Sequence, residues 1–167
     1  MILFSPEGKI KKYESIEEIL YEFYNIRIKY YELRKNFLLN ILNNEINIIN
    51  NKIRFIEMVV NNKVNLDYEN KDLLINELNR LKFDFFNIFN KDNIIINNEK
   101  STSNFDYLIK LKECNKKEIE KLNNEKNLKE EELKIIENLD IKKMWIDDLD
   151  ELENQLNNLK NLKTKYK

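Results

Sequence analysis

The feature that most constrains this chain is the long stretch Ser15–Val60, which contains neither glycine nor proline. Apolar residues return every three or four positions along it, which is the period of an amphipathic α-helix. Ser15, with Glu18 three residues later, has the pattern of a capping box at a helix N-terminus. At 1.5 Å per residue such a helix is roughly 70 Å long. A rod of this length buries little of itself, so its apolar stripe must pack on another helix, either later in the chain or in a second copy.

The apolar stripe of this helix divides into two seams, offset by a phase slip near residues 37–41. Both seams have the three-and-four spacing of a coiled coil, and we expect them to pack within a long antiparallel arm. The first seam comprises Phe23, Ile26, Tyr30, Leu33 and Phe37. The second comprises Leu42, Ile46, Ile49, Ile53, Ile56 and Val60.

The composition narrows the class of protein. The chain has 167 residues, of which 35% are charged, with one Gly and one Pro, so turns are scarce and the elements should be long and mostly helical. A net charge of −1 argues against an autonomous nucleic-acid-binding domain. The absence of His removes the commonest general base and the commonest zinc ligand. The single cysteine, Cys114, excludes an internal disulfide and points to a reducing compartment inside the cell.

The N-terminus, residues 1–14, predicts a β-hairpin. Ser5-Pro6-Glu7-Gly8 has the residues of a tight turn, because Pro presets φ and Gly tolerates a positive φ. A lone hairpin is marginally stable in water, so we expect it to complete a sheet from elsewhere in a larger protein. The start does not resemble a signal peptide, and no apolar run approaches the ~20 residues of a membrane span, so we expect no membrane contact.

The remainder of the chain predicts a small head and two returning helices. We expect a mostly helical head over residues 61–112, with a mobile loop over residues 84–104 in which Ile94–Ile96 could form a strand. A return helix should cover residues 113–139, and a last helix, with Asp140 as its N-cap, should cover residues 140–167 and pack back at the base. The expected fold is therefore mostly α: the helix over residues 15–60 and the return helix form an antiparallel arm, with the head at its tip and the hairpin at its base.

Several segments resemble the eukaryotic type IIA DNA topoisomerases, and they occur in that family's order. The first is LFSPEGKIKKYESIEEILYEFYNIRIKYYELRKNFLL, residues 3–39. The others are NNKIRFIEMVVNNKVNL (50–66), NKDLLINELNR (70–80), FDYLIKL (105–111) and MWIDDLDELE (144–153). Each match alone is weak, but together they span nearly the whole chain. After FDYLIKL this chain is about five residues shorter than the family pattern.

The resemblance implies a position at the end of the family's DNA breakage-reunion core, namely its coiled-coil arm and C-terminal gate. Such a segment mediates homodimerisation through the head and opens to release the transported DNA duplex. In that family the ATP-binding domain, the Mg²⁺-binding acidic domain and the catalytic tyrosine lie upstream. The resemblance therefore implies an ATP- and Mg²⁺-dependent nuclear parent enzyme, and a segment that has no catalytic, cofactor or metal site of its own.

Three sets of residues are candidates for the functional surfaces. Apolar residues in the head exceed what a small core needs, so we expect some of them at a dimer interface rather than in the head's own core; these are Leu73, Leu74, Leu78, Phe83, Phe85, Phe86 and Phe105. A basic zone near the base could face DNA or could form salt bridges with Glu17, Glu18 and Glu32; it comprises Lys9, Lys11, Lys12, Arg27 and Arg34. On the last helix we expect Trp145, Leu149 and Leu152 to pack against the long helix, with Trp145 as the anchor.

Two other functions remain open from the sequence. Heptads, high charge and few turns are also typical of a coiled-coil scaffold or parallel dimeriser, which would pair side by side along residues 23–37. A stand-alone nucleic-acid binder is opposed by the net charge and by the lack of a matching motif.

Overall fold

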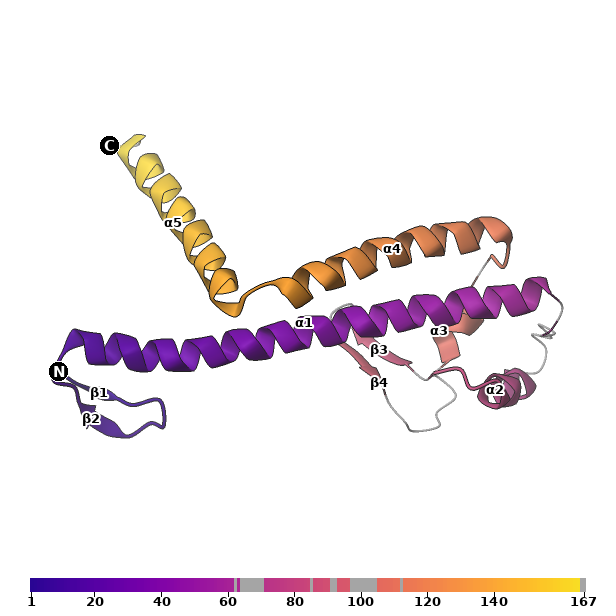
Figure 1. Cartoon of the computed structure of the whole chain (residues 1–167), viewed down its shortest axis with the longest axis horizontal. Coiled ribbons are helices and arrows are strands. Elements are labelled where there is room, and N and C mark those ends of the chain that lie inside the picture. Colours follow the sequence, from indigo (N-terminus) through magenta and orange to yellow (C-terminus); the bar gives the residue numbers. More distant parts are fainter. Residues whose placement is uncertain are drawn as a thin grey trace. The chain divides into compact units, whose positions relative to one another are not determined.

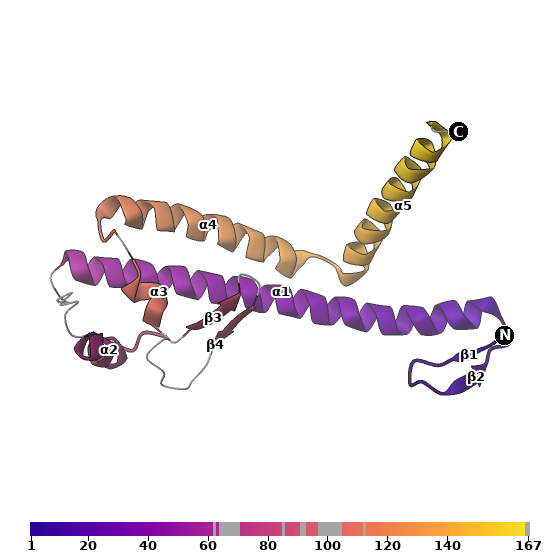
Figure 2. The ribbon, with the colours of Figure 1, turned by 180° about the vertical axis from the view of Figure 1, so that it is seen from behind.

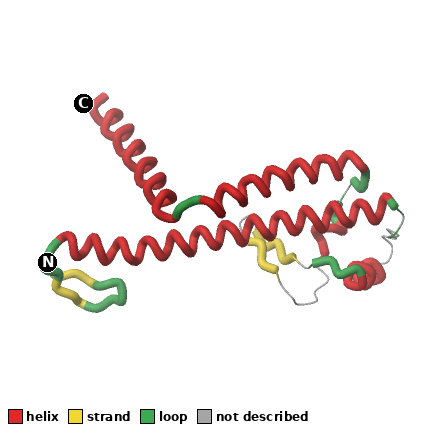
Figure 3. The backbone as a smooth tube through the Cα atoms, in the orientation of Figure 1, coloured by secondary structure: helices red, strands yellow, loops and turns green. Residues whose placement is uncertain are grey.

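The computed structural model describes residues 1–61, 63, 71–84, 86–90, 93–96, 105–111 and 113–165. Helices dominate these residues, as the sequence predicts (Figure 1). The helices are α1 (Ile16–Val60), α2 (Lys71–Arg80), α3 (Asp106–Ile109), α4 (Lys116–Asn138) and α5 (Ile141–Lys165). The strands are β1 (Ile2–Phe4), β2 (Ile10–Lys12), β3 (Phe86–Asn90) and β4 (Asn93–Ile96). Figure 3 shows α1 as one uninterrupted helix.

The chain divides into two compact units, and α1 passes through both. The hairpin unit consists of residues 1–37 and 138–167, and the head unit consists of residues 38–137. The hairpin unit contains β1, β2, the first half of α1 and α5. The head unit contains the second half of α1, α2, the strands β3 and β4, α3 and α4.

The predicted N-terminal hairpin is confirmed. Strands β1 and β2 pair antiparallel, with Leu3 opposite Lys11. Gly8 has φ +76, a left-handed conformation that glycine adopts without steric cost, and its N–H donates to the Ser5 carbonyl at 2.9 Å.

The N-terminus of α1 is capped largely as predicted. The Ser15 hydroxyl accepts from the Glu18 N–H at 3.2 Å. The Glu18 carboxylate, however, accepts from the N–H of Glu14 at 3.0 Å, one residue before the cap. Two N–H groups that have no helical partner are therefore satisfied at the start of the helix.

In the head unit, α4 lies beside the second half of α1 in both views (Figures 1 and 2). Ile49 and Ile56 of the second seam pack with Leu122 of α4, and all three are at most 4% exposed. Lys129 of α4 binds the Glu45 carboxylate of α1 at 2.9 Å. At this position along the two helices, an ion pair takes the place of an apolar contact. The order of these contacts shows that α1 and α4 run antiparallel.

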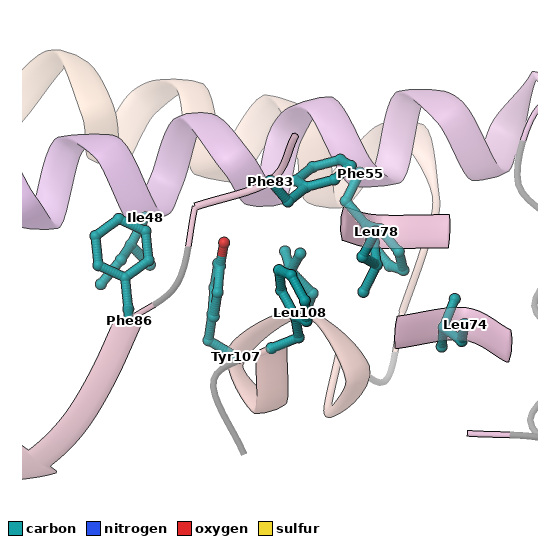
Figure 4. Close-up of a cluster of buried hydrophobic side chains, with 9 residues drawn as sticks. Ile48, Phe55, Leu74, Leu78, Phe83, Phe86, Tyr107 and Leu108 are labelled. Atoms are coloured by element: carbon teal, nitrogen blue, oxygen red, sulfur yellow. The ribbon is translucent and has the colours of Figure 1, made fainter. Parts of the chain in front are cut away.

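The head core lies between α1, α2 and α3 (Figure 4). Four large side chains of this core are below 2% exposed: Phe55, Phe105, Leu78 and Leu108. The rings of Phe55 and Phe83 meet edge to face with centroids 6.2 Å apart, and those of Phe86 and Tyr107 do so at 5.3 Å.

The segment over residues 84–104, for which we expected a loop, contains two strands. Strands β3 and β4 form an antiparallel pair there, with Phe86 opposite Ile96 and an irregularity between Ile88 and Asn90. The sequence suggested a strand only at Ile94–Ile96, which lies in β4. The alternation of apolar residues with Asn in β3 is also a strand signal, but the general abundance of Asn in this chain weakened it. The remaining parts of this segment, residues 85, 91–92 and 97–104, lie outside the described residues.

Two leucines on α2 provide a direct test of the head core. Leu78 is 0% exposed and Leu73 is 65% exposed. We expect Leu78→Ala to lower the free energy of unfolding by about 2–5 kcal/mol, because it removes buried methyl groups and leaves a cavity. Leu73→Ala should change it by at most about 0.5 kcal/mol, since its side chain already meets water. Urea denaturation measures both, and equal effects of the two substitutions would contradict this core.

Candidate functional site at the helix joint and the head

The contact between α1 and α5 in the hairpin unit is built around Trp145. Its ring stacks on Tyr24 with centroids 5.5 Å apart and on Tyr31 at 5.8 Å. Phe23 meets it edge to face at 6.1 Å. Trp145, which we expected to anchor the last helix on the long helix, lies at the centre of this contact. We call this contact, with its polar neighbours Arg34 and Asp148, the joint.

Polar groups close one side of the joint. The Tyr31 hydroxyl donates to Asp148 Oδ2 at 2.7 Å, and Arg34 Nη1 donates to the same oxygen at 2.6 Å. These two donors stabilise the carboxylate and lower the pKa of Asp148 below its ordinary value. Burial, followed by the hydrogen bond to Asp148, raises the pKa of Tyr31, so this tyrosine stays a neutral donor. Lys35 donates to the Leu139 carbonyl at 2.8 Å, just before α5 begins.

Most of the predicted arm-packing side chains are solvent-exposed in the structure. Phe23, Tyr30, Leu33 and Phe37 are 53–62% exposed, Leu149 is 49% and Leu152 is 54%. Ile26 is partly buried. Heptad spacing could not distinguish this stripe from the one through Tyr24 and Tyr31, which are also seven residues apart. The second stripe makes the contact because it provides two rings for Trp145 and a hydroxyl for Asp148.

The basic zone forms mostly salt bridges, although not with the predicted acids alone. Lys11 binds Glu22 at 3.1 Å and Glu18 at 3.4 Å. Lys12 binds Glu14 at 3.1 Å, and Arg34 binds Asp148. The Arg27 guanidinium lies 5.2 Å from the centroid of the Tyr31 ring, in a cation–π position. Within the part of the chain that the structure describes, the expected partners Glu17 and Glu32 form no ion pair with these cations. Lys9 lies in the turn before β2, and its backbone N–H donates to the Ser5 hydroxyl at 3.4 Å.

The predicted dimer-interface set lies mostly inside the head core. Leu74, Leu78, Phe83, Phe86 and Phe105 are 0–5% exposed and belong to one cluster. Their burial corrects the prediction, because side chains that cover one another in this way leave almost no exposed surface for a partner. The sequence analysis overestimated how many apolar residues of the head are left over for an interface. The reason is that β3 and α3 add surface to the head core, and these side chains cover that surface. Leu73 is exposed, and Phe85 lies outside the described residues.

A polar clamp that the sequence analysis missed fixes the turn after α2 to α1. Lys82 has φ 55, a left-handed conformation in which glycine is the usual residue. Arg54 of α1 donates to the carbonyls of Leu81 and Lys82 at this turn and places its guanidinium 4.3 Å from the Phe83 ring centroid. The largely buried amide of Asn51 donates to Asp84 Oδ2 at 2.9 Å. Side chains of α1 thus stabilise a strained turn from outside.

Tyr107 of α3 completes this clamp from the other side. Its hydroxyl donates to the Asp84 carbonyl at 2.8 Å. Burial, together with the negative charge of Asp84, raises the pKa of Tyr107 well above its ordinary value, so the phenol stays protonated and keeps donating. Asn51, Arg54 and Tyr107 all lie in segments that resemble the topoisomerase family, residues 50–66 and 105–111. That resemblance did not indicate their contacts, because the turn that they bind is distant in the sequence.

The described residues hold no group of three or more His, Cys, Asp or Glu side chains placed to bind a metal ion. Within the same residues, no helix is long and apolar enough to cross a bilayer. Cys114 is partly buried against both apolar clusters, and this burial raises the pKa of its thiol.

Comparisons with known proteins give one consistent result. The family model for the A subunit of DNA gyrase/topoisomerase IV matches residues 1–150. DNA topoisomerase 2 of Plasmodium falciparum is 30% identical over 92% of this chain, and that of Acanthamoeba polyphaga mimivirus is 34% identical over 90%. DNA topoisomerase 2 of Saccharomyces cerevisiae is 36% identical over 52% of the chain. This chain spans only 12%, 12% and 6% of these three proteins, in the order named.

A solved structure extends the similarity to three dimensions. The crystal structure of the Plasmodium falciparum topoisomerase II DNA-binding, cleavage and re-ligation domain aligns with 99% of this chain at a TM-score of 0.78 and 31% identity. The alignment covers 24% of the solved chain.

The joint predicts a pH dependence of stability. The pKa of Asp148 is lower in the folded chain than in the unfolded chain, where it is about 3.9. The ionised Asp148 therefore adds its full contribution to the free energy of unfolding above about pH 3.9. This contribution is lost as the pH falls through the lower pKa of the folded chain. Trp145 is the only tryptophan and reports directly on this contact. We expect Asp148→Asn to lower stability above about pH 4 and the difference from wild type to vanish at lower pH. Urea denaturation followed by Trp145 fluorescence measures this.

The matched control is Asp150→Asn, which alters an exposed acid on the same helix. It should leave the pH profile as in the wild-type chain. An Asp148→Asn profile parallel to wild type from about pH 2 to about pH 7 would contradict the role assigned to Asp148.

Proposed function

We propose the role of this chain from the family to which it belongs. It is a member of the type II DNA topoisomerases, since the family model for the A subunit of DNA gyrase/topoisomerase IV matches residues 1–150. Within that family we propose that it forms the coiled-coil arm and the C-terminal gate through which a transported duplex leaves. The observation that carries this proposal is that nearly the whole chain aligns with about a quarter of a solved DNA-binding, cleavage and re-ligation domain.

The head unit supplies the gate in this proposal. A gate between two copies must hold the dimer together and still open, which favours a modest apolar contact with a polar rim over a fully dry interface. The exposed face of α2 has this character. Leu73 is 65% exposed on it, and Asp72, Asn76 and Arg80 are polar neighbours. We therefore assign the homodimer contact to this face and not to the buried head core.

The second half of α1 and α4 form the arm that carries the head. Ile49, Ile56 and Leu122 hold the two helices together with apolar contacts. The Glu45–Lys129 pair adds a polar contact whose position depends on the register of the helices. The polar clamp from Arg54 and Asn51 attaches the turn after α2 to α1, so the head should move with the arm as one body.

ATP, Mg²⁺ and double-stranded DNA belong to the whole protein in this proposal, of which this chain would supply a small part. Lys11, Lys12 and Arg34 are engaged with carboxylates, so any contribution of the basic zone to DNA binding should be weak and sensitive to salt. A nuclear location stays a proposal from the family, since the relatives include a mitochondrial and a viral protein.

A second candidate function is a scaffold that dimerises side by side along α1. The observation in its favour is the exposed stripe of Phe23, Tyr30, Leu33 and Phe37. Spin labels at Asn36 separate the two functions by the distance between copies. Labels close together favour pairing along α1, and labels far apart favour copies joined only through the head.

The gate proposal predicts the effect of a charge on α2. We expect the chain to dimerise in sedimentation equilibrium and Leu73→Asp to weaken the dimer about tenfold or more, because an unpaired carboxylate would enter the apolar centre of the contact. Leu128→Asp is the matched control: Leu128 is 67% exposed on α4, outside the proposed contact face. It should leave the dimer unchanged. A monomeric wild-type chain, or equal weakening by both substitutions, would contradict a gate formed by this face.

A further inference from the structure

The contact between α1 and α4 in the head unit contains a charged pair beside its apolar residues. Leu122 of α4 packs with Ile49 and Ile56 of α1. Further along the same contact, Glu45 of α1 and Lys129 of α4 meet at 2.9 Å, and their side chains are only 27% and 31% exposed. A partly buried ion pair often stabilises a fold no better than two apolar side chains of similar volume. Stability alone therefore does not explain why charges occupy this position.

The two charges depend on each other closely. Oε2 of Glu45 is shut off from water, and the ammonium of Lys129 balances its charge. The interaction with Glu45 is the main cause of the raised pKa of Lys129, so this ammonium stays charged. Lys129 also binds Glu132 on its own helix at 3.2 Å. Separating Glu45 from Lys129 would leave a buried carboxylate oxygen without a cation, which is strongly unfavourable.

The apolar residues alone allow more than one register of α4 on α1. In an antiparallel pair, each residue forward along α4 corresponds to one residue back along α1, so Leu133 lies opposite Leu42. A slide of α4 by one heptad, roughly 10 Å, would place Leu133 opposite Ile49, which is again an apolar partner. Residues 110–115 link α3 to α4. A segment of this length spans roughly 20 Å when extended, so its length does not prevent such a slide.

The charges distinguish these registers. One heptad before and one heptad after Glu45, on the same face of α1, the chain has Leu38 and Lys52. A slide of one heptad would therefore place the Lys129 ammonium against a leucine in one direction and against another ammonium in the other. Glu45 would face an apolar residue of α4 in both cases. Among these three registers, only the observed one brings the two opposite charges together.

We propose that the Glu45–Lys129 pair is a register lock, which selects one of the registers that the apolar residues of α1 and α4 allow. A polar contact inside a helix pair can specify its register in this way, at a cost in stability. The lock keeps the far end of α4 at a fixed position along α1 relative to the head core. This inference goes beyond the proposed gate and does not depend on it, because it concerns only the packing of two helices within the head unit.

Disulfide trapping measures the register in the whole chain. The native cysteine is first replaced by Cys114→Ser. Leu133→Cys is then combined either with Leu42→Cys, which detects the observed register, or with Ile49→Cys, which detects the register shifted by one heptad. A disulfide needs Cα atoms within about 7 Å, and a heptad is roughly 10 Å long, so each cysteine pair detects one register. The cross-link of interest is the one within a single chain.

The charged pair is then changed in two ways. Glu45→Leu with Lys129→Leu makes the position apolar, and Glu45→Lys with Lys129→Glu exchanges the charges and is the matched control. We expect the wild-type and charge-exchanged backgrounds to form only the cross-link of the observed register. In the leucine background the shifted cross-link should appear. The ratio of the observed to the shifted cross-linking rate should fall about tenfold or more, because no misplaced charge then opposes the slide.

Urea denaturation distinguishes the register lock from a role in stability alone. The leucine variant should have a free energy of unfolding at least equal to that of the wild-type chain, although its register is less well defined. Circular dichroism establishes that each variant keeps its helices.

Three results would overturn the register lock. The first is a leucine background that cross-links only in the observed register, which would assign the choice of register to the link between α3 and α4. The second is a shifted cross-link that forms equally well in the charge-exchanged background, because the pairing of opposite charges would then not set the register. The third is a leucine variant with a lower free energy of unfolding than wild type and an unchanged ratio of cross-linking rates, which would show that the pair only stabilises the contact.

Discussion

The length of α1 is the constraint on which the other elements depend. A helix of 45 residues cannot cover its own apolar side chains, so each part of it needs a partner from elsewhere in the chain. The second half obtains α4 and the head core, and side chains such as Ile56 and Phe55 become fully buried there. The first half obtains the hairpin and the start of α5, which cover much less of it. The two units therefore differ in how completely the same helix is buried.

The head depends on a turn that this composition makes difficult. The chain has one Gly, and it lies in the N-terminal hairpin, so Lys82 must adopt the left-handed conformation after α2. Such a conformation costs of the order of 1 kcal/mol and persists only when its surroundings hold it. Arg54 does so by donating to the carbonyls of the turn and packing over Phe83. A single arginine on α1 thus compensates for a glycine that this turn lacks.

The periodicity of apolar residues predicted the helices and the N-terminal hairpin better than it predicted which of their faces pack against other elements. The hairpin at Pro6 and Gly8 and the helical character of Ser15–Val60 follow from local chemistry, and the structure has both. Heptad spacing did not reveal that Tyr24 and Tyr31, and not Tyr30 and Phe37, would meet Trp145. That choice depends on a contact between residues more than a hundred positions apart. Leu78 was expected at an interface but lies in the core for a similar reason. The number of apolar residues in a segment does not indicate which of their side chains pack against one another.

The two halves of α1 also differ in the kind of contact that stabilises them. Removing Phe55 or Leu78 from the head core would cost several kcal/mol, so the head unit has one stable packing. The joint combines an aromatic stack with an exposed ion pair, and such a pair contributes at most about 1 kcal/mol. In the hairpin unit the start of α5 is therefore held mainly by the stack of Trp145 on Tyr24 and Tyr31, whereas the head is held by side chains buried on all sides.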